Sequence, residues 1–465
     1  MSAVGTGQDA LIERPRRPAA GAPRPYRFPR FDRAVLPNGL KLVVAPISKL
    51  PIVTIMLLAD AGAVSDPVGS AGLAQLTARL LLEGTSSGDG GTITDQFERL
   101  GASIEAHADW DVASVSMTTL TERLDEAFAL LGRVLRAPEF NNREVERLKQ
   151  ERLAELLQLR AEPRGLADEL FSRFLYDGSS RYAQPDGGDE ASVRGLSRES
   201  VVRFYEQRYS PSSMTLIVAG DVQTTQIEQL ARKVLGDWRG NVTVASSTMD
   251  DPARRTRAVH IVNKPDAPQS ELRIGHLGIP RRHPDYFPAV IMNAVLGGLF
   301  SSRINLNLRE VHGYTYGASS YFDWRRQRGP WVVATAVASD VTHAAAAEVI
   351  KEIERIRLAE IKEDELTLAT SYLDGVFPIR FETTGAIAGA LSTLVAYELP
   401  DDWYDEYRER VRNVTVGDVL IAAERHLRPE ALQMVVVGNA AAVRGGLEAL
   451  GFGPVRVYDV EGRPA

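Results

Sequence analysis

Residues 196 to 221, LSRESVVRFYEQRYSPSSMTLIVAGD, are the most informative segment for the architecture because a later segment of the chain repeats their pattern. Residues 414 to 439, VTVGDVLIAAERHLRPEALQMVVVGN, align on them without a gap, at a constant offset of 218 residues (414 minus 196). Pro211 aligns with Pro429, and an apolar strand precedes the final glycine of each segment. Self-similarity at a fixed offset indicates a duplicated structural unit. We therefore expect two copies of one unit.

Each copy mixes strand patterns with helix patterns. Apolar runs and period-2 alternation predict strands at 40–44, 52–58, 101–108 and 112–119 in the first copy, and at 259–263, 272–279, 314–322 and 330–339 in the second. Helical periodicity covers 121–137, 142–176 with a break near Pro163, 286–297 and 344–373. Groups of strands covered by helices are typical of an α+β sandwich, and this is the fold class we expect for both copies.

The chain divides into four segments by composition. Residues 1–33, rich in Pro, Ala and Arg, are expected to form a flexible N-terminal arm. The first copy spans 34–240, a polar linker spans 241–257, and the second copy spans 258–465. The N-terminus lacks the apolar run of a secretory signal, and no stretch approaches the roughly 20 apolar residues of a membrane span. We expect a cytoplasmic protein without a membrane span, or a periplasmic one if a signal has been removed.

Composition excludes several classes of function. The 465 residues include 44% hydrophobic and 25% charged residues, as in globular proteins. A net charge of −7 gives no basic footprint, so no nucleic-acid partner is expected. The absence of cysteine excludes disulfides, thiolate metal ligands and a cysteine nucleophile. The seven histidines are scattered without metal-ligand spacing, so no ligand set is expected among them.

A short helix is predicted at residues 72–85, GLAQLTARLLLEGT, between two glycines. Leu73, Leu76 and Leu80 follow helical spacing and are expected to face a core, with Gln75 and Arg79 on another side. Taken alone, this segment is an ordinary amphipathic helix.

The same segment resembles the zinc-site helix of the M16 family (insulinase, pitrilysin, mitochondrial processing peptidase), in which an HxxEH motif precedes apolar residues and Gly-Thr. In that motif two histidines four residues apart share one helix face and hold zinc, while the glutamate activates water. Here the motif positions are Gln75, Ala78 and Arg79. An amide is a poor zinc ligand, a methyl group accepts no proton, and a guanidinium is a permanent cation. We expect no catalytic metal in this chain.

A third zinc ligand of the family is a glutamate in a later helix, which ERLAELLQLRAEPRGLADELF (151–171) resembles. Glu155 falls on the ligand position, 76 residues after Arg79 (155 minus 79). A single glutamate on a helix is usually a solvated surface residue. The resemblance predicts instead that Glu155 is a retained buried carboxylate and that Arg79 takes the place of the zinc and pairs with it.

The second copy carries LGGLFSSRINLNLREVHGYTYG at 296–317, similar to a GG..SSR....LRE..G..Y pattern of M16 chains. The family's Arg and Tyr bind the substrate backbone near the scissile bond; here they correspond to Arg309 and Tyr316, seven apart (316 minus 309). Such donors stabilise a developing oxyanion. The alternative is structural: Arg309 ends a helix that Gly313 caps, and Tyr316 begins a strand.

Gly297 and Gly298, in the same pattern, have two interpretations of equal weight. They permit a tight turn or close contact with a substrate peptide, or they end one helix before the next.

The lost HxxEH and the retained Arg and Tyr resemble the non-catalytic subunit of bacterial two-chain M16 peptidases. The resemblance implies that two sandwich repeats form one half of a clamshell and complete, in trans, the active site of an HxxEH-bearing subunit. The zinc would belong to that partner, and the substrate would be a peptide or unfolded protein bound by strand addition. Two alternatives remain: a structural or assembly subunit, like the M16-derived core proteins of a respiratory complex, and a peptide-binding homodimer with no role in hydrolysis.

Overall fold

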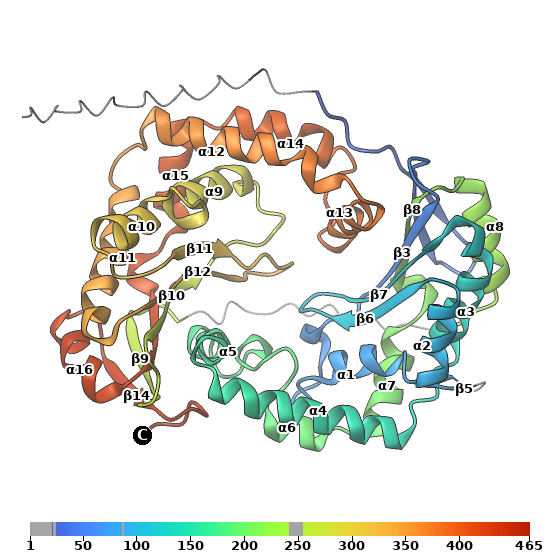
Figure 1. Ribbon diagram of the computed structural model, residues 1–465, viewed down its shortest axis with the longest axis horizontal. Coiled ribbons are helices and arrows are strands. Elements are labelled where there is room, and N and C mark those ends of the chain that lie inside the picture. The colour runs from blue at the N-terminus through green and yellow to red at the C-terminus, as the bar shows by residue number, and fades with distance from the viewer. Residues whose placement is uncertain (1–20, 22–24, 86–87, 241–253) are drawn as a thin grey trace, which may run out of the picture.

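The computed structural model describes residue 21 and residues 25–85, 88–240 and 254–465 (Figure 1). The expected linker therefore lies largely outside the described residues. Two six-stranded mixed sheets lie on opposite sides of the molecule, each accompanied by helices (Figure 1). This α+β architecture is the predicted fold class.

The first sheet has the strand order β1-β2-β8-β3-β7-β6. Its strands are β1 (Asp32–Val35), β2 (Lys41–Pro46), β3 (Ile52–Ala59), β6 (Ser103–Ala108), β7 (Ala113–Leu120) and β8 (Met214–Gly220). A two-stranded ribbon, β4 (Gly84–Thr85) with β5 (Gly88–Asp89), stands apart from it.

The second sheet has the order β11-β12-β10-β13-β9-β14. Its strands are β9 (Ala258–Asn263), β10 (Ser270–Leu277), β11 (Ala318–Phe322), β12 (Pro330–Val337), β13 (Gln433–Gly438) and β14 (Val455–Tyr458).

Five strands of each sheet share one topology, since β2-β8-β3-β7-β6 corresponds to β9-β13-β10-β12-β11. In both sheets the first pair is parallel and the other three pairs are antiparallel. The strands of the repeated segments, β8 and β13, are buried at every residue, because each lies between two neighbours in a sheet with both faces covered. The outermost strands differ: β1 pairs antiparallel with β2, whereas β14 pairs parallel with β9. The predicted duplication is thus present in three dimensions.

The helices of the first copy follow the predicted periodicity. Pro163 stands at the first position of α5, where its missing N–H costs no hydrogen bond, and this explains the break between α4 and α5. The helices are α1 (Leu73–Leu80), α2 (Gly90–Arg99), α3 (Leu124–Arg136), α4 (Asn142–Ala161), α5 (Pro163–Leu175), α6 (Glu190–Gly195), α7 (Arg198–Arg208) and α8 (Thr224–Leu235).

The second copy contains two π-helical segments, which the sequence patterns do not predict. They are η5 (Ala294–Gly298), which continues α9, and η6 (Leu306–Val311), which continues α10. The α-helices are α9 (Tyr286–Asn293), α10 (Arg303–Asn305), α11 (Thr342–Ile356), α12 (Glu363–Val376), α13 (Thr384–Ala396), α14 (Trp403–Arg412), α15 (Val416–His426) and α16 (Ala440–Ala449).

The helical stretch Tyr286–Val311 is long and apolar enough to cross a membrane by length and composition, contrary to the expectation that no stretch approaches a membrane span. Of its most apolar window, 56% is buried inside the fold. Ile291, Leu296 and Ile304 belong to the main hydrophobic cluster. Such burial is typical of a core helix.

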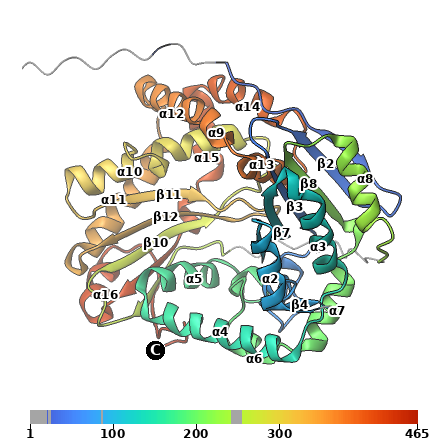
Figure 2. The same cartoon turned by 45° about the vertical axis from the view of Figure 1, so that its right-hand side comes forward.

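The two copies exchange one helix each, which the sequence repeats do not reveal. Helix α5 of the first copy packs on β10 and β13 of the second sheet, and α13 of the second copy packs on β3 and β8 of the first (Figures 1 and 2). Leu170 of α5 shares a cluster with Val435, and Leu391 of α13 shares one with Ile217. Each sheet therefore depends on the other copy to cover one of its faces.

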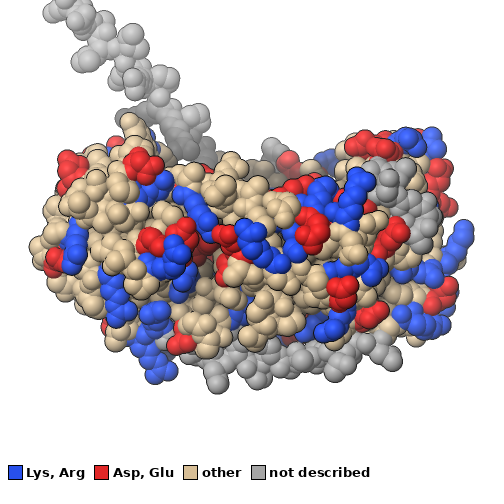
Figure 3. Space-filling model, turned by 90° about the horizontal axis from the view of Figure 1, so that it is seen from below, with Lys and Arg blue, Asp and Glu red and all other residues tan. Residues whose placement is uncertain are grey.

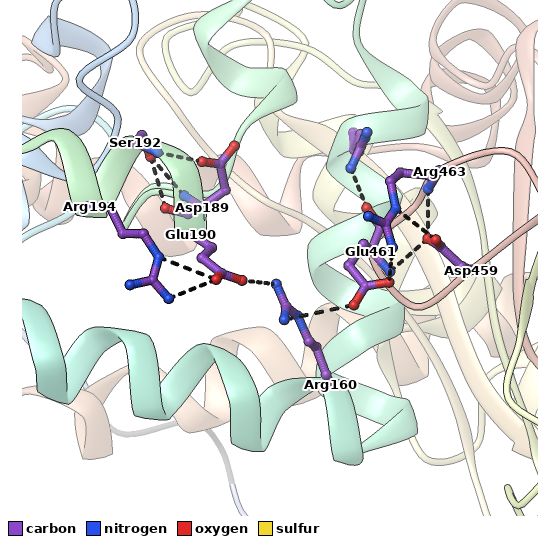
Figure 4. A network of polar contacts seen from close by, with 9 residues as sticks. Arg160, Asp189, Glu190, Ser192, Arg194, Asp459, Glu461 and Arg463 are labelled. Carbon is purple, nitrogen blue, oxygen red and sulfur yellow. Dashed lines mark hydrogen bonds and ion pairs between the residues drawn. The ribbon is translucent and has the colours of Figure 1, made fainter.

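Polar contacts reinforce the exchange. The guanidinium of Arg273 on β10 is 2% exposed and pairs with Asp168 of α5 and Glu271. At the C-terminal end, Arg160 of α4 contacts both Glu190, at 2.8 Å, and Glu461, at 3.8 Å (Figure 4). The last residues of the second copy are thereby tied to the first.

The N-terminal segment also joins the two copies. The expectation of a flexible arm over the whole of residues 1–33 is therefore wrong for its last part. Residues 1–20 and 22–24 of that range lie outside the described part. Phe28 is buried and stacks on Tyr404, with ring centroids 4.7 Å apart. Arg33 pairs with Asp401 at 2.6 Å. Residues 25–33 are therefore packed against the second copy.

Candidate functional site

The helix that resembles a zinc-site helix is α1, and its apolar face lies where the periodicity places it. Leu73, Leu76 and Leu80 are buried in the first core, and Ala78 is fully buried beside them. The helix begins after Gly72, whose φ of 93° is a left-handed conformation that favours glycine.

Arg79 makes the expected contact with Glu155, and a closer one with another residue. Its guanidinium lies 3.5 Å from Glu155 and 2.7 Å from Glu151, one turn earlier on α4. Glu155 also pairs with Arg152 at 3.3 Å. The side chain of Glu155 is 50% exposed, so the expectation of a buried carboxylate is wrong. The carboxylate reaches solvent because α4 lies at the outside of the first copy (Figure 1).

The remaining motif position also makes a protein contact. Gln75 donates a hydrogen bond from Nε2 to Oδ2 of Asp186 at 2.9 Å. The cavity beside it has a volume of only about 20 Å³ and is lined by the cationic side chains Arg79, Lys149 and Arg152.

These residues do not fit a zinc ion. A dication needs anionic or neutral donors that converge on it. Here Glu155, the one carboxylate at a motif position, is instead in contact with the guanidinium groups of Arg79 and Arg152. The side chains at this position therefore do not form a convergent ligand set of the kind that the HxxEH motif provides.

The second site begins at the end of η5. Gly297 is buried, and a Cβ atom there would lie 2.8 Å from the backbone nitrogen of Ser320 in β11. Gly298 is exposed, and a Cβ atom would lie 2.8 Å from Nδ2 of Asn293. Close packing accounts for Gly297, which favours the structural interpretation of the glycine pair over contact with a peptide.

The next motif residue, Arg303, fixes α10 against α12. It makes two hydrogen bonds to the carboxylate of Glu365, from Nε at 2.6 Å and from Nη2 at 2.7 Å. This paired donation lowers the pKa of Glu365. The role of Arg303 is therefore structural.

The loop that carries Tyr316 is held from both sides. Thr315 and Gly317 both accept hydrogen bonds at 3.1 Å from the hydroxyl of Thr335 on β12. Asn305 of α10 accepts a hydrogen bond from the backbone N–H of Ala318 at 3.0 Å. The loop backbone is thus positioned before any ligand arrives.

The side chain of Tyr316 is 92% exposed. Its hydroxyl group makes no hydrogen bond to another described residue. The structural alternative fails for this residue, because β11 begins only at Ala318 and Tyr316 lies outside the strand. Gly313 does end the preceding helix, with φ +67°.

Arg309 lies in the last turn of η6, and its guanidinium stacks over the ring of Phe300, 4.7 Å from the ring centroid. Glu310 lies 3.4 Å from its Nε. Phe300 is 70% exposed, a large apolar surface that the sequence analysis did not single out. The ring orients the guanidinium without occupying its hydrogen-bonding edges.

The motif thus separates into two groups by the contacts that its residues make. Gly297, Arg303 and Gly313 have structural reasons within the fold, whereas Arg309 and Tyr316 present donors to solvent from a braced backbone.

The structure does not bring the two sites of this chain together. Helix α1 belongs to the first copy and α10 to the second, on opposite sides of the molecule (Figure 1). Among the described residues, no hydrogen bond or ion pair joins Arg309 or Tyr316 to Gln75, Arg79 or Glu155.

Seen from below, Lys and Arg side chains are interspersed with Asp and Glu (Figure 3). This face carries no extended patch of one sign.

Comparisons with known proteins agree with these features. Two family models match: Insulinase (Peptidase family M16) over residues 42–180, and Peptidase M16 inactive domain over residues 195–373. An uncharacterized zinc protease of Rickettsia bellii is 22% identical over 414 residues, covering 88% of this chain and 98% of the relative. The beta subunit of the mitochondrial-processing peptidase of Saccharomyces cerevisiae is 21% identical over 446 residues, covering 90% and 93%.

A solved structure shares the architecture over nearly its whole length. It is a peptidase M16 inactive domain from Pseudomonas fluorescens, with a TM-score of 0.83 and 25% identity, covering 88% of this chain and 98% of that one. The duplicated fold, the matched family models and these relatives together show that the chain belongs to the M16 peptidase family.

Proposed function

We propose that this chain is the non-catalytic, substrate-binding subunit of a two-chain M16 zinc peptidase. In this proposal Arg309 and Tyr316 complete the active site of a partner that carries HxxEH, and the zinc belongs to the partner. The observation that carries the proposal is the contrast between the two sites. Arg79 and Arg152 lie at the position of the zinc site in the motif. Arg309 and Tyr316, in contrast, are both present and reach solvent, and hydrogen bonds hold the loop of Tyr316 in place.

The chemistry of the pair suits peptide hydrolysis. Water attack on a peptide carbonyl places negative charge on its oxygen, and preorganised donors stabilise that charge. The hydroxyl of Tyr316 and the guanidinium of Arg309 are such donors. Tyr316 is exposed, and the acidic neighbour of Arg309, Glu310, is itself exposed. Since this chain offers no water-activating group at its own motif, the activating group must come from a second chain.

An extended peptide also has strand edges to join. Within the described part of the chain, the outer strands β6 and β11 each pair with a single neighbour, and β11 begins two residues after Tyr316. Strand addition would bind the peptide through its backbone, so that side-chain selectivity would be modest.

Reconstitution tests the proposal. The chain is purified from its native host with its bound proteins, which are then identified, and an HxxEH-bearing M16 chain is expected among them. Each subunit alone should leave a quenched fluorogenic peptide intact, and the mixture should cleave it in a chelator-sensitive manner. Full activity of the HxxEH chain alone, unchanged by adding this subunit, would contradict the proposal.

A further inference from the structure

Two histidines and one aspartate from two separate segments converge in the second copy. His283 and Asp285 form the turn before α9, and His426 is the last residue of α15. Helices α9 and α15 pack against each other and bring the three side chains together. One possible ligand atom from each residue lies within 4.8 Å of the other two. Sequence spacing gave no sign of this set.

The three groups already form a compact polar cluster. Nε2 of His426 lies 2.7 Å from Oδ2 of Asp285, and the two imidazole rings have centroids 4.9 Å apart at an interplanar angle of 79°. The backbone N–H of Asp285 donates to Nδ1 of His283 at 3.0 Å. His426 is 10% exposed and Asp285 is 29% exposed, so the cluster is partly desolvated yet open to solvent.

We propose that His283, Asp285 and His426 form a binding site for a divalent transition-metal ion, with zinc as the fitting physiological ion. Two imidazoles and one carboxylate form a three-ligand set for zinc, and a water molecule completes tetrahedral coordination. When the metal takes Nε2 of His426, the N–H bond on that nitrogen breaks and its proton leaves to solvent, while Nδ1 takes up a proton, so that the imidazole stays neutral.

The position of the cluster in the fold also bears on cation binding. His426 ends α15, where the helix dipole favours a cation. One group opposes binding: the guanidinium of Arg425 lies 3.8 Å from Asp285.

The bound ion would clamp the end of α15 to the start of α9. Since α9 continues into η5, the clamp would stabilise the second copy without taking part in hydrolysis. This site is independent of the proposed function, because it uses none of the residues of either M16 motif.

Binding of Zn²⁺ and Co²⁺ to the tag-free full chain tests the site. Equilibrium dialysis should give one ion per chain, Co²⁺ should show visible absorption of a nitrogen-oxygen site, and saturating Zn²⁺ should raise the melting temperature. His426→Ala and His283→Ala should each weaken metal binding by about tenfold or more, since losing even a residue that only orients a metal ligand lowers metal affinity by about this factor. The exposed His107 provides the matched control, and His107→Gln should bind as the wild type does.

Arg425→Ala distinguishes a metal site from a purely structural histidine-aspartate pair. Removing the opposing charge should tighten metal binding, whereas a structural pair gives no reason for any effect on metal affinity. Absence of stoichiometric binding, or equal binding by wild type, His426→Ala and His283→Ala, would overturn the proposal.

Discussion

The guanidinium of Arg79 lies 3.5 Å from the carboxylate of Glu155, at the positions that the M16 motif assigns to zinc ligands. The contact is an ion pair of two side chains that are 37% and 50% exposed. Exposed pairs of this kind contribute roughly 0–1 kcal/mol to stability. The pair therefore contributes little to the stability of the fold.

Restoring the histidines should restore metal affinity at this position. Gln75→His together with Arg79→His places two imidazoles one turn apart and frees Glu155 from one of its two guanidiniums. Equilibrium dialysis in a His426→Ala background should then show added zinc binding. The single change Arg79→His is the control, and a double variant that binds no more zinc than this control would show that Arg152 still blocks the position.

Tyr316→Phe should lower kcat of the reconstituted peptidase by about 10², because it removes one preorganised donor to the oxyanion. The Michaelis constant should change little, since the ring remains. Tyr372→Phe, at another tyrosine that is half-exposed, serves as the matched control and should leave turnover intact. An unchanged rate for Tyr316→Phe would assign the hydroxyl no part in the reaction.

Arg309→Ala should act mainly on substrate binding and raise KM. Phe300→Leu removes the ring beneath the guanidinium and should weaken binding in the same direction by a smaller factor, about threefold, from a cation–π contact of about 0.5–1 kcal/mol. Arg123→Ala in the first copy is the control. If Phe300→Leu matched wild type while Arg309→Ala did not, the ring would have no role in orienting Arg309.

Acid should weaken the fold through its buried histidines. Burial lowers the pKa of both His260 and His276 to about 4, from about 6.5 in the unfolded chain. In His276 both ring nitrogens are used by the neutral form, because Nδ1 donates to Leu277 and Nε2 accepts from the N–H of Arg428. The unfolded state binds protons first, so this stability is present above pH 6.5 and is lost as pH falls from 6.5 to 4, by up to about 3 kcal/mol per histidine.

Urea unfolding at several pH values measures this effect. The burial-raised pKa of Asp111, about 6, acts in the opposite direction over part of this range, so the comparison is made between wild type and His276→Gln. The variant should show a shallower loss of unfolding free energy between pH 6.5 and 4. Parallel pH profiles would exclude His276 as a source of acid sensitivity.

The helix exchange predicts that neither copy folds alone. A fragment ending at Gly240 lacks α13 and exposes the face of the first sheet that Leu391 and its neighbours cover, while a fragment beginning at Arg254 lacks α5. Each fragment should bind a hydrophobic dye and lack a cooperative melting transition, and mixing the two should restore both properties. Cooperative melting of either fragment alone would show that the exchange is not required for folding.

The two alternatives for the chain as a whole differ from the proposal in one measurable respect. A structural subunit or a peptide-binding homodimer needs no donor aimed at an oxyanion. Loss of turnover on Tyr316→Phe in a reconstituted peptidase, with assembly unchanged, would separate the proposed function from both.

Local patterns in the sequence predict the duplicated architecture and single out Arg309 and Tyr316 as candidate donors. The repeat around Gly220 and Gly438 predicts the duplication because buried central strands need long apolar runs. The motif that includes Arg309 and Tyr316 is local, so its seven-residue spacing survives in the printed letters.

Contacts between distant segments are visible only in the folded chain. The tertiary structure placed α5 and α13 on each other's sheets, gave Arg79 a closer partner in Glu151, and brought His426 within 2.7 Å of Asp285, 141 residues earlier. Periodicity in the sequence shows which face of a helix or strand is apolar. It does not show which other element covers that face, because any apolar surface of suitable shape can do so. The physical reason is that burial is non-directional, whereas local spacing is fixed by backbone geometry.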